Sequence, residues 1–98
     1  MRILIKTVFG QTLFHSQDEV VSMKVEKGDV WHLQLSGIDA AIAQKILNHQ
    51  TDVHAFYFER NHKWWLSFTN EPAISYDEAN QIMHLSFDSI FEYRPDQI

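Results

Sequence analysis

Two runs of alternating apolar and polar residues limit what this chain can fold into more than any other feature. Apolar side chains recur at every second position along Val20–Glu26 and again along Val30–Ser36. Successive side chains of a strand point to opposite faces, so each run places its apolar set on one side of a sheet. Gly28, in the intervening Glu26–Asp29 segment, allows the positive φ of a tight turn. The pattern therefore predicts an antiparallel hairpin with one face in water.

Four further segments have the composition of strands, and one has the composition of a helix. β-Branched and aromatic residues mark the four predicted strands, which are Arg2–Val8, Thr12–His15, Val53–Glu59 and Lys63–Thr69. The helix is predicted to begin at Ser36, a favourable N-cap, with Asp39 in its first turn, and to end at Asn48–Thr51. Its apolar residues recur with the period of an amphipathic helix.

Residues 75–93 fit two different elements. The segment Ser75–Glu78 matches a capping box, which predicts a helix that begins at Tyr76. Met83–Phe87 alternates between apolar and polar residues, as a strand would. We expect the helix, because the capping box defines a start for it.

Together these elements predict an α+β fold in a single domain, residues 1–98. We expect a mostly antiparallel sheet of five to six strands with two helices on one face, in the order β-β-β-β-α-β-β-α. The chain is 45% apolar, and 98 residues can bury a core without cross-links. It has no cysteine, which excludes disulfides, thiolate metal ligands and a cysteine nucleophile. Because small secreted domains often carry disulfides, we expect a cytoplasmic location. No stretch is apolar enough to span a membrane, so no membrane partner is expected.

The segment HAFYFERNHKWWLSF, residues 54–68, is the most aromatic part of the chain. Its two strands can pair in different registers, and a slip of one residue moves every side chain of a strand to the other face. We predict a three-residue loop at Arg60–His62, because that register concentrates the burial of large apolar side chains. The residues that it assigns to the core are Phe56, Phe58, Trp64, Leu66 and Phe68.

The predicted register leaves Tyr57 and Trp65 paired on the opposite face. Either a helix covers this pair, or the two rings are exposed beside Arg60. A Tyr–Trp pair next to an arginine has the composition of a protein-binding hot spot. Tyr57, Trp65 and Arg60 are therefore candidate partner-binding residues.

The negative charge of the chain is concentrated towards its end. The net charge is −5, and residues 71–98 carry all of that excess, with six acidic residues and one basic residue. An acidic region attracts basic protein surfaces and repels phosphates. A solvated helix that aids solubility would carry the same charges. The candidate contact residues here are Asp77, Glu78, Asp88 and Glu92.

These observations favour a small, acidic, non-enzymatic binding protein. An inhibitor or immunity-type protein that blocks a basic partner, such as a nucleic-acid-acting enzyme or a toxin, would have these properties. The alternative is a self-associating domain, a homodimer formed through Tyr57 and Trp65 or through a free sheet edge. A third interpretation is a small histidine-dependent enzyme or a metal-binding protein.

Motifs for catalysis, metal binding and phosphate binding are not recognisable in this sequence. Six histidines are present, but none has the spacing of a zinc site, and His15, His32 and His54 would converge only if their strands and faces agreed. We therefore predict no catalytic residues, no metal and no cofactor. Direct nucleic-acid binding is not expected either, because Arg60 and Lys63 flank only the predicted hairpin tip instead of a sheet face.

Overall fold

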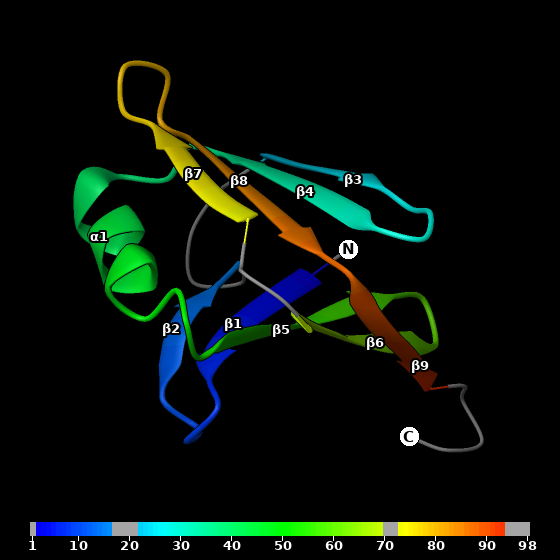
Figure 1. Ribbon diagram of the computed structural model, residues 1–98. Coiled ribbons are helices and arrows are strands. Elements are labelled where there is room, and N and C mark those ends of the chain that lie inside the picture. Colours follow the sequence, from blue (N-terminus) through cyan, green and yellow to red (C-terminus); the bar gives the residue numbers. More distant parts are fainter. Residues whose placement is uncertain (1, 17–21, 70–72, 94–98) are drawn as a thin grey trace.

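Two antiparallel sheets lie face to face in this protein, and one helix packs at an end of the pair (Figure 1). The computed structural model describes residues 2–16, 22–69 and 73–93. Over these residues it contains nine strands and one helix. The predicted α+β class with mostly antiparallel strands is thus confirmed, whereas the single sheet covered by two helices is wrong.

The larger sheet has five strands in the spatial order β2-β1-β5-β6-β9. They are β1 (Arg2–Thr7), β2 (Thr12–His15), β5 (Val53–Glu59), β6 (His62–Ser67) and β9 (Ser89–Tyr93). The smaller sheet has four strands in the order β3-β4-β8-β7. They are β3 (Ser22–Glu26), β4 (Trp31–Ser36), β7 (Ala73–Asp77) and β8 (Ile82–Phe87). The β3–β4 hairpin expected from alternation is confirmed, although Val20 and Val21 lie outside the described residues.

The core lies between the two sheets, and the strand residues that point inward into it are mainly apolar. In β4, Trp31, Leu33 and Leu35 are buried, while the residues between them are half-buried or exposed. Across the core, the Trp31 ring lies 5.7 Å from the Tyr57 ring and 5.4 Å from the Trp64 ring, measured between centroids. Each large side chain buried in this way contributes about 1.5–3 kcal/mol to stability.

The helix α1 (Ala40–Asn48) begins later than its sequence suggested. Asp39 is the N-cap, and its Oδ1 accepts a hydrogen bond of 2.9 Å from the backbone N–H of Ile42. The predicted cap, Ser36, is instead the last residue of β4, because Gly37 then adopts φ +88° and turns the chain. The helix contacts β2 and β7, and so closes one end of the space between the sheets.

The second predicted helix, over residues 76–93, is wrong. These residues form the end of β7, all of β8 and all of β9. The apparent capping box, Ser75–Glu78, is the end of β7 and the start of a hairpin turn, in which Asp77 Oδ1 accepts a hydrogen bond of 3.3 Å from the backbone N–H of Asn80. Short polar side chains make the same kind of bond in turns as at helix starts. The alternation of Met83–Phe87 decided the structure, since it lets β8 bury Met83, Leu85 and Phe87 completely.

The predicted register of the aromatic hairpin is also wrong. Tyr57 is paired with Trp64, and Phe56 is paired with Trp65, around a two-residue turn at Arg60 and Asn61. Arg60 has a φ of +56°, which such tight turns need at a central position. Trp64 and Leu66 are buried as predicted, but Tyr57 takes the core position that was assigned to the phenylalanines of β5.

Candidate functional site

The outer face of the five-stranded sheet carries aromatic rings and cationic side chains. Every second residue of its strands points away from the core, and the register aligns these residues across β1, β5, β6 and β9. Ten of them form a continuous surface that we call the aromatic face. They are Arg2, Leu4, Lys6, His54, Phe56, Phe58, Lys63, Trp65, Phe91 and Tyr93.

The centre of the aromatic face is a group of three rings from β5 and β6. Phe56 and Trp65 are nearly parallel, with an interplanar angle of 18° and centroids 6.4 Å apart. His54 meets both of them edge-on, with centroids 5.2 Å from Phe56 and 6.0 Å from Trp65. Trp65 Nε1 donates a hydrogen bond of 2.9 Å to His54 Nδ1. The indole is therefore held in place by one directed bond and two ring contacts.

His54 must be neutral to accept that bond, since a protonated imidazole has no free acceptor nitrogen. Its surroundings favour the neutral form. Partial burial is the main cause that lowers the pKa of His54 below 6.5, and the positive charge of Lys6 adds to it, while a hydrogen bond with the Thr7 backbone opposes both. At neutral pH the histidine thus acts as a fixed acceptor that orients Trp65.

Two cationic side chains lie directly on the rings of this face. The Arg2 guanidinium is 4.1 Å from the centroid of Phe58. Lys63 Nζ lies 4.7 Å from the ring of Phe56 and 5.3 Å from that of Tyr93. Contacts of this kind hold a cation near an apolar surface without an acidic partner. Over the described strands, no Asp or Glu side chain occupies an outward position of this sheet.

Two rings of the aromatic face are well exposed. Phe91 keeps 56% of its surface accessible, and Trp65 keeps 39%. They lie side by side, because Trp65 of β6 is paired with Phe91 of β9. Adjacent exposed rings of this size on a regular sheet mark a contact surface more often than a solvated one.

The candidate residues taken from the aromatic hairpin end in three different places. Trp65 is at the centre of the aromatic face, and Arg60 is at the β5–β6 turn. Tyr57 is 1% exposed, and its hydroxyl donates a hydrogen bond of 3.1 Å to Glu59 Oε2. Burial, and then the nearby negative charge of Glu59, raise the pKa of Tyr57 to about 12. Tyr57 is therefore a core residue that cannot meet a partner together with Trp65.

The four acidic candidates do not form one surface either. Asp77 ends β7 and Glu78 follows it in the β7–β8 turn, where hydrogen bonds from Asn80 lower the pKa of Asp77. Asp88 accepts two hydrogen bonds from Thr69, both of 2.8 Å. Glu92 lies opposite Trp64 on the inward side of β9, with its Oε1 3.7 Å from His62 Nδ1. The acidic candidates are thus divided among the β7–β8 turn, the β8–β9 junction and β9.

The register error hid most of the aromatic face from sequence analysis. Phe56 and Phe58 were assigned to the core, and Phe91 and Tyr93 to a helix. Two signals in the sequence are consistent with the true arrangement. Arg60–Asn61 can form a two-residue turn. In Ser89–Tyr93, Phe91 and Tyr93 are two positions apart, which places both rings on one side of a strand, as in β9.

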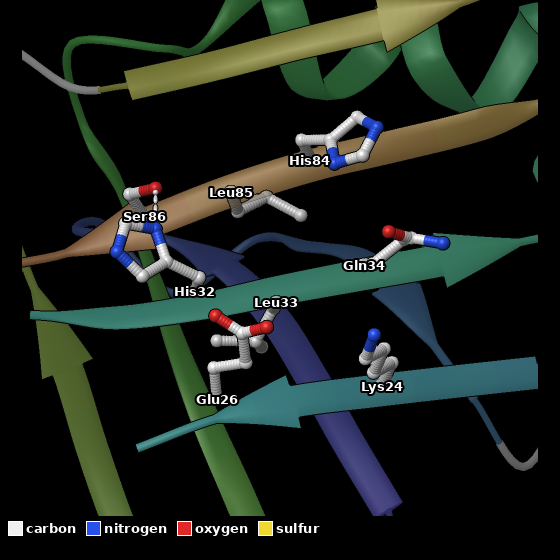
Figure 2. Close-up of a pocket in the computed structure, with 8 residues that line it drawn as sticks. All are labelled: Lys24, Glu26, His32, Leu33, Gln34, His84, Leu85 and Ser86. Carbon is white, nitrogen blue, oxygen red and sulfur yellow. Dashed lines mark hydrogen bonds between the residues drawn. The ribbon is translucent and has the colours of Figure 1, made fainter. Parts of the chain in front are cut away.

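A polar hollow lies on the opposite side of the molecule, on the outer face of the four-stranded sheet. Its lining residues are Lys24, Glu26, His32, Leu33, Gln34, His84, Leu85 and Ser86. Figure 2 shows His32 turned towards Ser86, and a distance of 2.8 Å separates His32 Nδ1 from Ser86 Oγ. A histidine this close to a serine hydroxyl raises the possibility of a serine nucleophile. Such a nucleophile also needs hydrogen-bond donors that stabilise the oxyanion formed in the reaction. Here β4 and β8 are inner strands of the ladder, so their backbone N–H groups are already bonded.

A cleft at the end of the sandwich away from the helix is lined by charged and aromatic side chains, several of which contact one another. Lys27 Nζ lies 2.8 Å from Glu59 Oε2 and 4.6 Å from the Trp64 ring centroid. The hydrogen bond from Lys27 is the main cause that lowers the pKa of Glu59. Arg60, His62 and Glu92 complete the lining. Because Lys27 and Glu59 are paired with each other, this cleft offers a ligand less than the aromatic face does.

The three histidines that the sequence left as a possible cluster, His15, His32 and His54, do not converge. His15 and His54 lie on outward positions of the five-stranded sheet, while His32 lies in the polar hollow. Within residues 2–16, 22–69 and 73–93, no group of three or more His, Asp or Glu side chains could hold a metal ion.

Comparisons with known proteins find no match: no family model, no curated protein and no solved structure resembles this chain significantly. The one helix of the described residues is too short to cross a bilayer. The function must therefore be argued from the surfaces described above.

Proposed function

We propose that this protein is a small non-enzymatic binding protein whose contact surface is the aromatic face. The observation that carries the proposal is the side-by-side exposure of Trp65 and Phe91 in a regular sheet. Exposed aromatic residues tend to dominate binding energies, since they bury a large area and lose few rotamers. The surrounding cations, with no acidic residue on the described part of this face, favour a partner that carries negative charge.

Preorganisation supports the same proposal. The hydrogen bond from Trp65 to His54 and the cation contacts on Phe56 and Phe58 hold these side chains in place before any partner arrives. A surface that is already ordered loses less conformational entropy on binding than a mobile one.

Capture of a partner from the cells that express this protein tests the proposal. The bait variants are the wild type, the double variant Trp65→Ala/Phe91→Ala, and the control Phe9→Ala. Phe9 is 93% exposed but lies in the β1–β2 turn, outside the aromatic face. We expect the wild type and the control to retain a common partner that the double variant loses. Retention of every partner by the folded double variant would overturn the proposal.

A second candidate function, as an inhibitor or immunity-type protein for a basic partner, rests on the acidic residues. Asp77, the last residue of β7, and Glu78 are adjacent where β7 meets the β7–β8 turn (Figure 1). The test is a charge reversal of Glu78, Asp88 and Glu92, with the affinity for a captured basic partner measured at two salt concentrations. If the charge-reversed variant bound the partner as tightly as the wild type does, or if salt left the affinity unchanged, this candidate function would be contradicted.

Self-association through the aromatic face is the remaining candidate, because two copies could bury their exposed rings against each other. Light scattering at high micromolar concentration separates the cases. A dimer that the Trp65→Ala/Phe91→Ala variant cannot form would replace an external partner with a second copy.

A further inference from the structure

The arrangement of rings and charges on the aromatic face suggests a particular class of partner. Resting on the proposed binding function, we infer that this face binds single-stranded nucleic acid, with bases stacked on its rings and phosphates held by its cations. Surfaces that bind single strands without sequence preference combine these two components.

The rings are spaced for an extended strand. Two strands each carry a pair of rings that are two positions apart in the sequence. These pairs are Phe56 and Phe58 on β5, and Phe91 and Tyr93 on β9, and the rings of each pair lie about 7 Å apart along the strand. Trp65 lies between the two pairs, since it is opposite Phe56 on one side and Phe91 on the other. Neighbouring strands are about 4.8 Å apart, so the five rings adjoin one another on one face, where Trp65 and Phe91 are the exposed ones. Every base has a π-face that can stack on such rings.

The cations border these five rings. Arg2 is at one end of the row that contains Phe58, Lys63 and Tyr93, and Lys6 lies at the opposite end of β1. Arg2 and Lys63 already contact the rings of Phe58 and Tyr93, so their charged ends lie on the same outer surface as the exposed rings. Arginine and lysine are the residues that most often meet phosphates in nucleic-acid complexes.

The net charge of −5 does not prevent this contact, because the nearby acids face the other way. Glu59 is bound to Lys27, and Glu92 lies on the inward side of β9 near His62. The Debye length at physiological salt is about 8 Å, so the charges on the face itself act most strongly on a bound strand.

A single strand fits this surface better than either main alternative. A duplex hides the faces of its bases and offers only groove edges, which a flat sheet of rings cannot read. An acidic peptide would satisfy the cations but would leave the row of rings without flat partners. The second alternative remains an outcome of the test.

Fluorescence anisotropy with three probes tests the inference. The probes are a labelled oligothymidylate of about 12 nucleotides, a duplex of the same length, and polyglutamate. We expect the single strand to bind, the duplex to bind much more weakly, and polyglutamate to bind weakly and without loss in Trp65→Ala. If Arg2, Lys6 and Lys63 each neutralise one phosphate, the logarithm of the binding constant should fall with the logarithm of salt with a slope of about −2.

Matched variants locate the site. Trp65→Ala and Phe91→Ala should each weaken binding of the oligothymidylate by roughly 5- to 150-fold, the range found for loss of one stacked base. Lys63→Gln should reduce the salt slope by about 0.7. Phe9→Ala and Lys24→Gln, which change an aromatic residue and a lysine elsewhere, should bind as the wild type does. Circular dichroism of each variant confirms that it is folded.

The possible failures are distinguishable. Absence of oligothymidylate binding, equal binding of the duplex, or wild-type affinity in Trp65→Ala would each overturn the inference. If polyglutamate binds tightly instead and Trp65→Ala weakens it, the partner is an acidic protein, so the proposed function stands while the nucleic-acid inference falls. If the capture experiment also shows no dependence on Trp65 and Phe91, both fall.

Discussion

The two outer faces of this sandwich are built from the same kind of strand, but they carry different side chains. The four-stranded sheet presents Lys24, Glu26, His32, Gln34 and Ser86, which mix both charges with neutral polar groups. Water can hydrogen-bond to the polar groups of such a face, and antiparallel sheets commonly have one solvated face. The five-stranded sheet presents the aromatic face, where rings and cations occupy the equivalent positions. Alternation alone therefore does not identify the solvated side of a strand, since the outward positions of the five-stranded sheet are also largely apolar.

The largest expected effect separates the inner and outer sides of β5. Tyr57→Ala should lower the free energy of unfolding by about 3–5 kcal/mol, because it empties a fully buried site, whereas Phe56→Ala should cost roughly 1 kcal/mol. Urea denaturation measures both. Tyr57→Phe serves as the control for the hydroxyl bond to Glu59, which is worth about 1 kcal/mol. If Phe56→Ala lowered the free energy of unfolding more than Tyr57→Ala does, the observed register would be contradicted and the register with the three-residue loop would be favoured.

A smaller effect compares one hairpin turn from each sheet. Arg60 and Gln81 have positive φ values, +56° and +54°, which cost a side chain about 1–2 kcal/mol. Arg60→Gly and Gln81→Gly should each raise the free energy of unfolding by about 0.5–1 kcal/mol, after allowing for the flexibility of glycine in the unfolded chain. Thermal unfolding measures the change. If residues 76–93 were a helix, Gln81→Gly would instead destabilise by about 1 kcal/mol, so the sign decides between the two structures.

The smallest effect is a pH dependence that should be specific to the aromatic face. Because the folded-state pKa of His54 is lowered, the unfolded chain binds more protons than the folded one just below pH ~6.5. The contribution of His54 to stability should therefore be present above that pH and be lost as the pH falls through its folded-state pKa. Protonation also removes the acceptor for Trp65 Nε1, so the tryptophan emission should change over the same range.

The variant for this prediction is His54→Gln, which removes the titrating imidazole. We expect it to flatten the dependence of stability on pH. The prediction is contradicted if stability in the wild type does not fall between about pH 7 and pH 5.

The sequence predicted local structure well where one interpretation of the pattern was possible. The strand at Thr12–His15, the β3–β4 hairpin and the presence of α1 agree with the structure. The errors occurred where two patterns competed. At Ser75–Glu78 the residues that resemble a helix cap end β7 and begin the turn, and at Arg60–His62 a difference of one loop residue exchanged the two sides of β5.

The candidate site was predicted in part only. Trp65 was singled out as a contact residue, and it lies at the centre of the aromatic face. Its neighbours on β1 and β9 could not be named, because Arg2 and Phe91 are far from it in the sequence. Only the order β1-β5-β6-β9 brings them to one surface.

The sequence by itself therefore determined that this chain forms mainly antiparallel strands, with one face of each strand apolar, because side-chain alternation is a local property of the backbone. The tertiary structure decided how the strands divide into two sheets, which side of β5 is buried and which rings and cations meet. Those choices depend on strand pairing over long separations, in which a shift of one residue costs little locally but reverses every face.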